Sequence, residues 1–221
     1  QDEEFLRNRA LPFMAETALF YEDFLIEDDD GYLMSLPSNS PENTPGNHWK
    51  GRGMGAAMET TINATMDFAI IKELLTNLVR SAQLTGSYHD RIETWKEMLK
   101  KIPPYQINDD KAIREWMHPF FDDNYHHRHQ SHAYPIFPGT ELIEEDDPEL
   151  FSAFVTAIKK RLVIGLKEQS GWSLVHMANN YARMTEPELA LECLETLARS
   201  CVINNFYTFH NDWRRMGICV E

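Results

Sequence analysis

Apolar residues recur every three to four positions over several long stretches of the chain, and apolar and polar residues nowhere alternate over the length of a β-strand. This spacing matches the turn of an α-helix, so one face of each stretch can be buried. The pattern therefore predicts an all-α protein. The predicted helices cover residues 3–25, 65–84, 89–101, 147–164, 170–184 and 185–197.

The apolar faces of these helices predict which side chains are buried. Helix 65–84 has the longest apolar stripe, and Gly86 follows it as a predicted C-terminal cap. Asp147 before Pro148 predicts a helix start, and Thr185 with Glu188 predicts a capping box. The predicted buried faces are Phe13, Leu19, Phe20, Phe24 and Leu25 in the first helix, Ile70, Ile71, Leu74, Leu75, Leu78, Val79 and Ala82 in the second, and Trp172, Val175, Tyr181 and Ala182 in helix 170–184.

Two stretches lie outside this helical pattern. Residues 35–49 contain three prolines, and residues 103–147 are rich in Pro, Asp, His and aromatic residues. Irregular segments of the second length are uncommon in compact domains unless they are functional. We therefore expect the functional residues in these two stretches.

Composition excludes several classes of protein. The formal net charge of −14 argues against a nucleic acid partner, because phosphate backbones are bound by clustered Lys and Arg. No apolar run approaches the roughly 20 residues that cross a membrane. Hydrophobic residues make up 43% of the 221 residues, which is too many for a disordered chain. The three cysteines have no CxxC spacing, so they predict neither a redox motif nor a complete disulfide set.

Glu42 is the candidate acid of the first stretch. Pro37, Pro41 and Pro45 fix their own φ angles and restrict the residues before them, so the backbone around Glu42 has few conformations. General acid catalysis needs a carboxyl group that is held within hydrogen-bond reach of the leaving oxygen. A solvated loop carboxylate is the alternative interpretation, and the residues alone leave both open.

A histidine cluster marks the second stretch, in "DDNYHHRHQSHAYPIFPG". Its imidazoles and aspartates are ligand types that suit a metal ion. Arg128 lies among them and would repel a cation, so we predict no metal here and no other cofactor. Arg and His side chains next to Tyr134 suit the binding of sugar hydroxyls, and a purely structural histidine network is the alternative.

The stretch "IREWMHPFFDD" adds Glu115 and Trp116 to the candidates. An aromatic ring beside a carboxylate can form the platform and the acid of a carbohydrate site. Large aromatic residues are also typical of a core, and that alternative stays open for Trp116.

The motifs "SLPSNSPEN", "TINATMDFAIIKELL", "IREW", "HHRHQSHAYPIFPG" and "SGWSLVHMANNYARM", in this order, resemble glycoside hydrolase family 95, the α-L-fucosidases and related α-L-galactosidases. The resemblance implies an inverting hydrolase with an (α/α)6 toroid of twelve helices. Only about half of these helices are predicted here. We therefore expect residues 1–221 to form a single partial catalytic domain, with helical hairpins forming part of the toroid, truncated at both ends.

The resemblance also implies roles for individual residues. Glu42 in "SPEN" matches the general acid of the family, and Arg128 and His129 in "HRH" match residues that hold the terminal sugar. Three more candidates for substrate binding, in supporting roles, are Glu115, Trp116 and His132. The asparagine and aspartate motifs that activate water in the family are absent, and Asp212 does not have the family context.

These expectations have a competitor and several consequences. A helical domain that binds glycans or a protein without catalysis is the alternative function. With the water-activating residues outside the sequence, we expect the isolated chain to be inactive or nearly so. Uncovered helix faces predict self-association into a homo-oligomer. The start at Gln1, without Met, predicts that a signal peptide or an upstream domain was removed, which is compatible with an exported parent protein.

Overall fold

The computed structural model describes residues 2–48, 60–165 and 168–208. The fold is all-α, as predicted, with one small antiparallel sheet of β1 (Ile26–Glu27) and β2 (Leu33–Met34) among the described residues. The helices are α1 (Glu3–Phe5), α2 (Leu11–Phe24), α3 (Thr65–Thr85), α4 (Ile92–Lys100), α5 (Pro148–Lys160), α6 (Gly171–Arg183) and α7 (Pro187–Ser200). Their pairing into hairpins agrees with a section of a helical toroid.

The N-terminal helical segment has the predicted extent, but its predicted buried face is only partly right: Leu25 is buried and Phe24 packs against the core, whereas the other predicted residues are exposed. A five-residue π-helix, Leu6–Ala10, joins α1 to α2 without a break. Phe13 is 71% exposed and Phe20 is 57% exposed, whereas Ala15 and Ala18 are buried against α3. The small alanine side chains allow two helices to approach closely, and this close packing turns the larger side chains outward.

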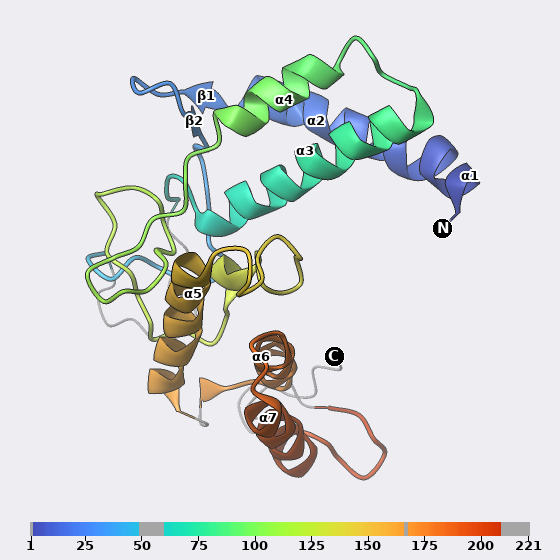
Figure 1. Cartoon of the computed structure of the whole chain (residues 1–221). Coiled ribbons are helices and arrows are strands. Elements are labelled where there is room, and N and C mark those ends of the chain that lie inside the picture. Colours follow the sequence, from blue (N-terminus) through green and yellow to red (C-terminus); the bar gives the residue numbers. More distant parts are fainter. Residues whose placement is uncertain (1, 49–59, 166–167, 209–221) are drawn as a thin grey trace.

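The α3–α4 hairpin follows the prediction from the sequence. Ile71, Leu75 and Leu78 of the α3 stripe are fully buried, and Trp95 of α4 packs in the same core. Gly86 caps α3 with a left-handed φ of 64°, a conformation that glycine adopts without a steric penalty. Figure 1 shows α2, α3 and α4 together on one side of the molecule.

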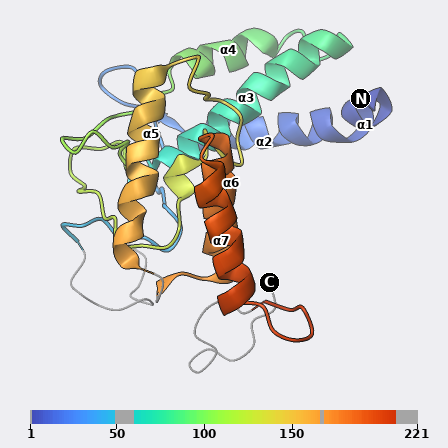
Figure 2. The same ribbon diagram turned by 60° about the horizontal axis from the view of Figure 1, so that its bottom comes forward.

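Helices α5, α6 and α7 lie on the other side, as Figures 1 and 2 show. The Asp147 side chain accepts a hydrogen bond from the Leu150 amide, which confirms the predicted start of α5. The N-cap residue of α7 is Glu186, which makes no capping hydrogen bond through its side chain. The capping box predicted at Thr185 is therefore wrong, and the φ of 55° at Thr185 shows that the chain turns there instead.

The face predicted for helix 170–184 is also corrected. Tyr181 is buried as predicted, but Trp172 is 44% exposed and Val175 is 39% exposed, and Leu174 and Met177 are buried instead. The helix presents Met177 and Tyr181 to the core shared with α5 and α7. Trp172 instead contacts His129 in the irregular segment of residues 103–147.

The segment of residues 103–147 is irregular apart from a short 3-10 turn at Ser131–Ala133, as predicted. It crosses between the two cores and contributes Met117 to one and Ile113 to the other. The end of the proline-rich stretch before residue 49 lies against it, since the Gly46 amide donates to the Asp122 carbonyl. Residues 49–59 and 209–221, which include Asp212 and Cys219, lie outside the described residues.

Candidate active site

Glu42 lies on a tight turn with an unusual backbone conformation. The Asn43 amide donates to the Ser40 carbonyl, which closes the turn. Glu42 has a φ of 58°, in the left-handed region. For a residue with a Cβ this conformation costs about 1 to 2 kcal/mol, so the surrounding contacts must hold it. The Glu42 side chain is 53% exposed and therefore accessible to a ligand.

The histidine-rich segment faces this turn. Arg128 Nη2 donates to Glu42 Oε2 at 2.5 Å, and His129 Nε2 lies 3.5 Å from the same oxygen. The structure thus brings together the three residues that the sequence singles out most strongly, although Arg128 is 86 positions after Glu42 in the chain. A carboxylate, a guanidinium and an imidazole meet at one accessible point.

Two histidines also hold the backbone of the turn. His129 Nδ1 lies 3.3 Å from the Pro41 carbonyl, and since a carbonyl only accepts, this nitrogen carries the hydrogen in that contact. The His127 ring hydrogen-bonds to the Glu42 backbone. Burial, with the positive charge of Arg128, lowers the pKa of His129, and burial next to Arg161 lowers the pKa of His127 to about 2. Both rings are therefore neutral at neutral pH.

An aromatic array extends from His129. The Trp172 ring lies edge-on to His129 with centroids 5.0 Å apart, and it stacks on His176 at 5.2 Å with nearly parallel planes. His176 covers one side of the Trp172 ring, and the ring is still 44% exposed. Burial lowers the pKa of His176 to about 4, so this ring is neutral too. The sequence predicted that Trp172 is buried in the core. The pattern of apolar and polar residues along α6 does not indicate that Trp172 lies exposed beside His129.

The other three candidates lie behind the turn and not on its open side. Glu115, Trp116 and His132 are at most 3% exposed. Trp116 packs against Phe121, and His132 lies beside Arg161, with Nδ1 3.4 Å from the guanidinium. Their burial does not support direct contact with a sugar.

Glu115 is the centre of a buried network that the sequence did not predict. Its carboxylate accepts hydrogen bonds from Ser40 Oγ at 2.6 Å and from Asn43 Nδ2 at 2.7 Å. It also pairs with Arg161, which is 1% exposed. Arg161 directly follows α5, at the start of a short 3-10 turn, and no pattern in the sequence predicted its burial.

A metal ion has one candidate position among the described residues. Glu42, His127 and His129 offer ligand atoms within 4.8 Å of one another. Arg128 already occupies a Glu42 oxygen, and both rings hydrogen-bond to the backbone of the turn. A cation would have to displace these contacts, so the donor set fits a metal poorly.

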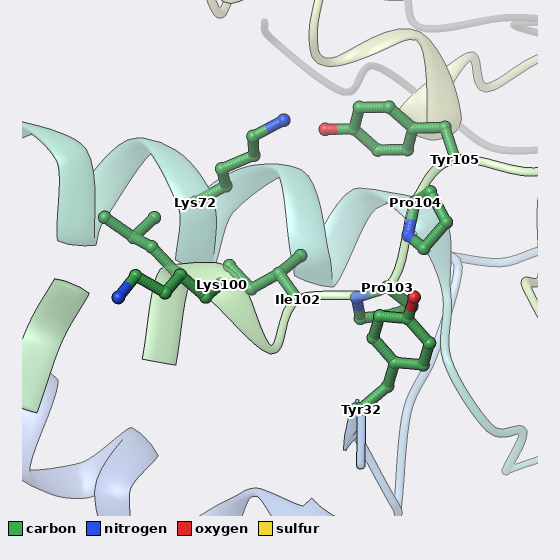
Figure 3. Close-up of a pocket in the computed structure, with 8 residues that line it drawn as sticks. Tyr32, Lys72, Lys100, Ile102, Pro103, Pro104 and Tyr105 are labelled. Atoms are coloured by element: carbon green, nitrogen blue, oxygen red, sulfur yellow. The ribbon is translucent and has the colours of Figure 1, made fainter. Parts of the chain in front are cut away.

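A separate hollow lies away from this site. It has a volume of about 300 Å³ and is formed where β2, α3 and the end of α4 meet, as Figure 3 shows. Two of its polar groups pair within the protein, since Lys72 and the Tyr105 hydroxyl both contact Glu141. We assign no chemistry to it. The residues that line it are Tyr32, Lys72, Leu99, Lys100, Ile102, Pro103, Pro104 and Tyr105.

Similarity to known proteins identifies the family of the chain but does not test the individual site residues. No described helix is long and apolar enough to cross a membrane. Residues 1–215 match the model of the glycosyl hydrolase family 95 catalytic domain. Over 190 residues the chain is 36% identical to alpha-L-fucosidase 2 of Arabidopsis thaliana. The aligned region covers 86% of this chain but only 22% of that protein, so the chain spans about a fifth of the length of this relative. On this coverage and identity, the chain belongs to glycoside hydrolase family 95.

Proposed function

We propose that the protein is an inverting glycoside hydrolase that removes terminal α-L-fucosyl or α-L-galactosyl residues, with Glu42 as its general acid. One observation carries the proposal: the accessible carboxylate of Glu42 lies within 2.5 Å of Arg128 and 3.5 Å of His129 on a fixed turn. The name of the plant relative favours fucose as the sugar.

Arg128 and His129 bind the sugar in this proposal. A guanidinium has five donors in a fixed plane, so it can bind sugar hydroxyls in one orientation. The pairing with Arg128 requires an ionised Glu42, whereas a general acid must carry a proton. When the substrate binds, sugar hydroxyls that accept hydrogen bonds from the Arg128 guanidinium would replace Glu42 as its partner and release Glu42 from the ion pair.

His129 can then assist the protonated acid. With its hydrogen on Nδ1, the neutral ring presents the lone pair of Nε2 to Glu42 Oε2. A protonated Glu42 can donate to this nitrogen until the leaving oxygen takes the proton. Trp172 offers an exposed ring for contact with the apolar side of a sugar. Glu115, Trp116 and His132 support the site from behind.

The described residues supply only the acid side of the reaction. Inversion needs a second group that activates water on the opposite face of the sugar, roughly 6.5–9.5 Å from the acid. The nearby carboxylate of Glu115 is buried and paired with Arg161, so it cannot take this role. We propose that residues 1–221 form one section of the catalytic domain and that this section alone turns over substrate slowly or not at all.

The test uses the full-length protein with an alkyl α-L-fucoside and the matching α-L-galactoside, whose leaving groups need a proton. Glu42→Gln should lower kcat by about 10²- to 10⁴-fold, because it removes the proton donor. Glu97→Gln, at an exposed ion pair with Lys100, is the matched control. NMR of the first product should show the inverted β-anomer. Full activity of Glu42→Gln would refute the assignment, and sugar binding without hydrolysis would favour the non-catalytic alternative.

We also propose that the 221-residue chain self-associates through its exposed apolar helix faces. Phe13 and Phe20 on α2, with Leu191 and Leu194 on α7, are each at least 47% exposed. Apolar patches of this kind favour association. Light scattering should show a mass above the 25.8 kDa of the monomer, which Phe13→Ser with Phe20→Ser would lower. A monomer at high concentration would exclude self-association.

A further inference from the structure

We infer that Glu115 and Arg161 form a positioning pair, which holds the turn of Glu42 so that the acid points at the leaving oxygen. The inference rests on the proposed function of Glu42. Neither residue touches the substrate, because Glu115 is 3% exposed and Arg161 is 1% exposed. Their effect on catalysis would pass entirely through the turn.

A single carboxylate holds both ends of this turn. Ser40 and Asn43 flank Pro41 and Glu42 in the sequence. Ser40 Oγ donates to one oxygen of Glu115 at 2.6 Å, and Asn43 Nδ2 donates to the other oxygen at 2.7 Å. The distance between the two flanking side chains is thereby tied to the geometry of one rigid group.

Arg161 holds Glu115 in place and fixes a second acceptor. Its guanidinium pairs with the same Glu115 oxygen that accepts from Asn43. It also donates to the Asn124 carbonyl, which accepts from Asn43 Nδ2 at 3.0 Å. The two acceptors of the Asn43 side-chain amide, the Glu115 carboxylate and the Asn124 carbonyl, are therefore both in contact with the buried guanidinium of Arg161. The positive charge of Arg161 compensates the negative charge of the buried carboxylate, because an unpaired charge is costly to bury.

The conformation of Glu42 shows why such a clamp is needed. A non-glycine residue with a φ of 58° persists only where its surroundings hold it. Release of either flanking hydrogen bond allows the turn to relax toward a common backbone conformation, and the carboxyl group then changes direction. A displacement of about 1 Å at a reacting group can cost on the order of 10²-fold in rate.

A positioning role differs from a structural role in its dependence on the leaving group. An alkoxide leaves only when it is protonated, so its departure depends on the placement of Glu42. A dinitrophenolate leaves without a proton. Loss of folded protein lowers both reactions equally, whereas a misplaced acid lowers only the first. The ratio of the two kcat values isolates the placement of the acid.

The experiment measures this ratio in the full-length protein with an alkyl and a dinitrophenyl α-L-fucoside. The variants are Glu115→Gln and Ser40→Ala. The matched control is Ser38→Ala, in the same loop, where the buried hydroxyl donates to Asp67 of α3 at 2.6 Å and not to Glu115. We expect the alkyl-to-dinitrophenyl ratio to fall about ten-fold or more in both variants and to stay unchanged in the control.

If Glu115→Gln does not fold, Ser40→Ala decides the outcome. The Ser40→Ala variant keeps the ion pair between Glu115 and Arg161 intact. An unchanged ratio in Ser40→Ala, or an equal fall of the ratio in Ser38→Ala, would overturn the positioning role. A wild-type protein that hydrolyses neither fucoside would refute the proposed function itself, and the inference with it. The wild type thus tests the function, and the variants test the clamp.

Discussion

The buried ion pair between Arg161 and Glu115 predicts a large loss of stability when one partner is removed. Arg161→Met keeps most of the side-chain length and deletes the charge. Glu115 would then keep its hydrogen bonds from Ser40 and Asn43 but lose its cationic partner. Removal of one partner from a buried pair costs about 3 to 5 kcal/mol, because the other charge stays buried without compensation.

The retained hydrogen bonds place the expected loss at the lower end of this range, at about 3 kcal/mol of unfolding free energy. For a chain of this size each kcal/mol lowers Tm by about 2 to 4 °C, so Tm should fall by about 6 to 12 °C. Circular dichroism during heating of the wild type and the variant measures this difference.

Arg199→Met is the matched control. Arg199 pairs with Glu195 one turn earlier on α7, but its side chain is 78% exposed. Exposed pairs of this kind contribute less than about 1 kcal/mol, so its Tm should change by no more than a few degrees. An equal shift in both variants would refute the reasoning, since burial would then make no difference. Addition of Glu115→Gln to Arg161→Met should restore part of the lost stability.

Three further predictions follow from the site. The lowered pKa values of His127 and His176 mean that the unfolded chain binds more protons below about pH 6.5, so the unfolding free energy should fall as the pH drops from 7 to 5. His176→Phe should reduce this slope in denaturant titrations, and an unchanged slope would contradict the lowered pKa. Trp172→Ala should weaken sugar binding about three- to ten-fold in calorimetry, because it removes a ring that can stack on the sugar. Phe206→Ala, which removes another exposed ring, is the control and should leave sugar binding unchanged. Treatment with a chelator should leave hydrolysis unchanged, and elemental analysis that finds a stoichiometric metal would contradict the cofactor-free site.

Local patterns were sufficient where one helix face decided the packing. The stripe of α3 and its cap at Gly86 could be predicted because both depend on neighbouring residues in the chain. The start of α5 at Asp147 could be predicted for the same reason. The face of α2 could be predicted only in part, because apolar residues lie on several sides of that helix and the choice of face depends on what packs against it.

The sequence by itself determined the helices, the irregular segment and the residue types that make Glu42, Arg128 and His129 candidates, since proline restriction and helical periodicity are local properties. Only the tertiary structure decided that Arg128 meets Glu42 and that Arg161 pairs with Glu115 beneath the turn. It also decided that Trp172 is exposed beside His129. These contacts join residues distant in the chain, and their energies depend on burial and charge compensation, which no local pattern encodes.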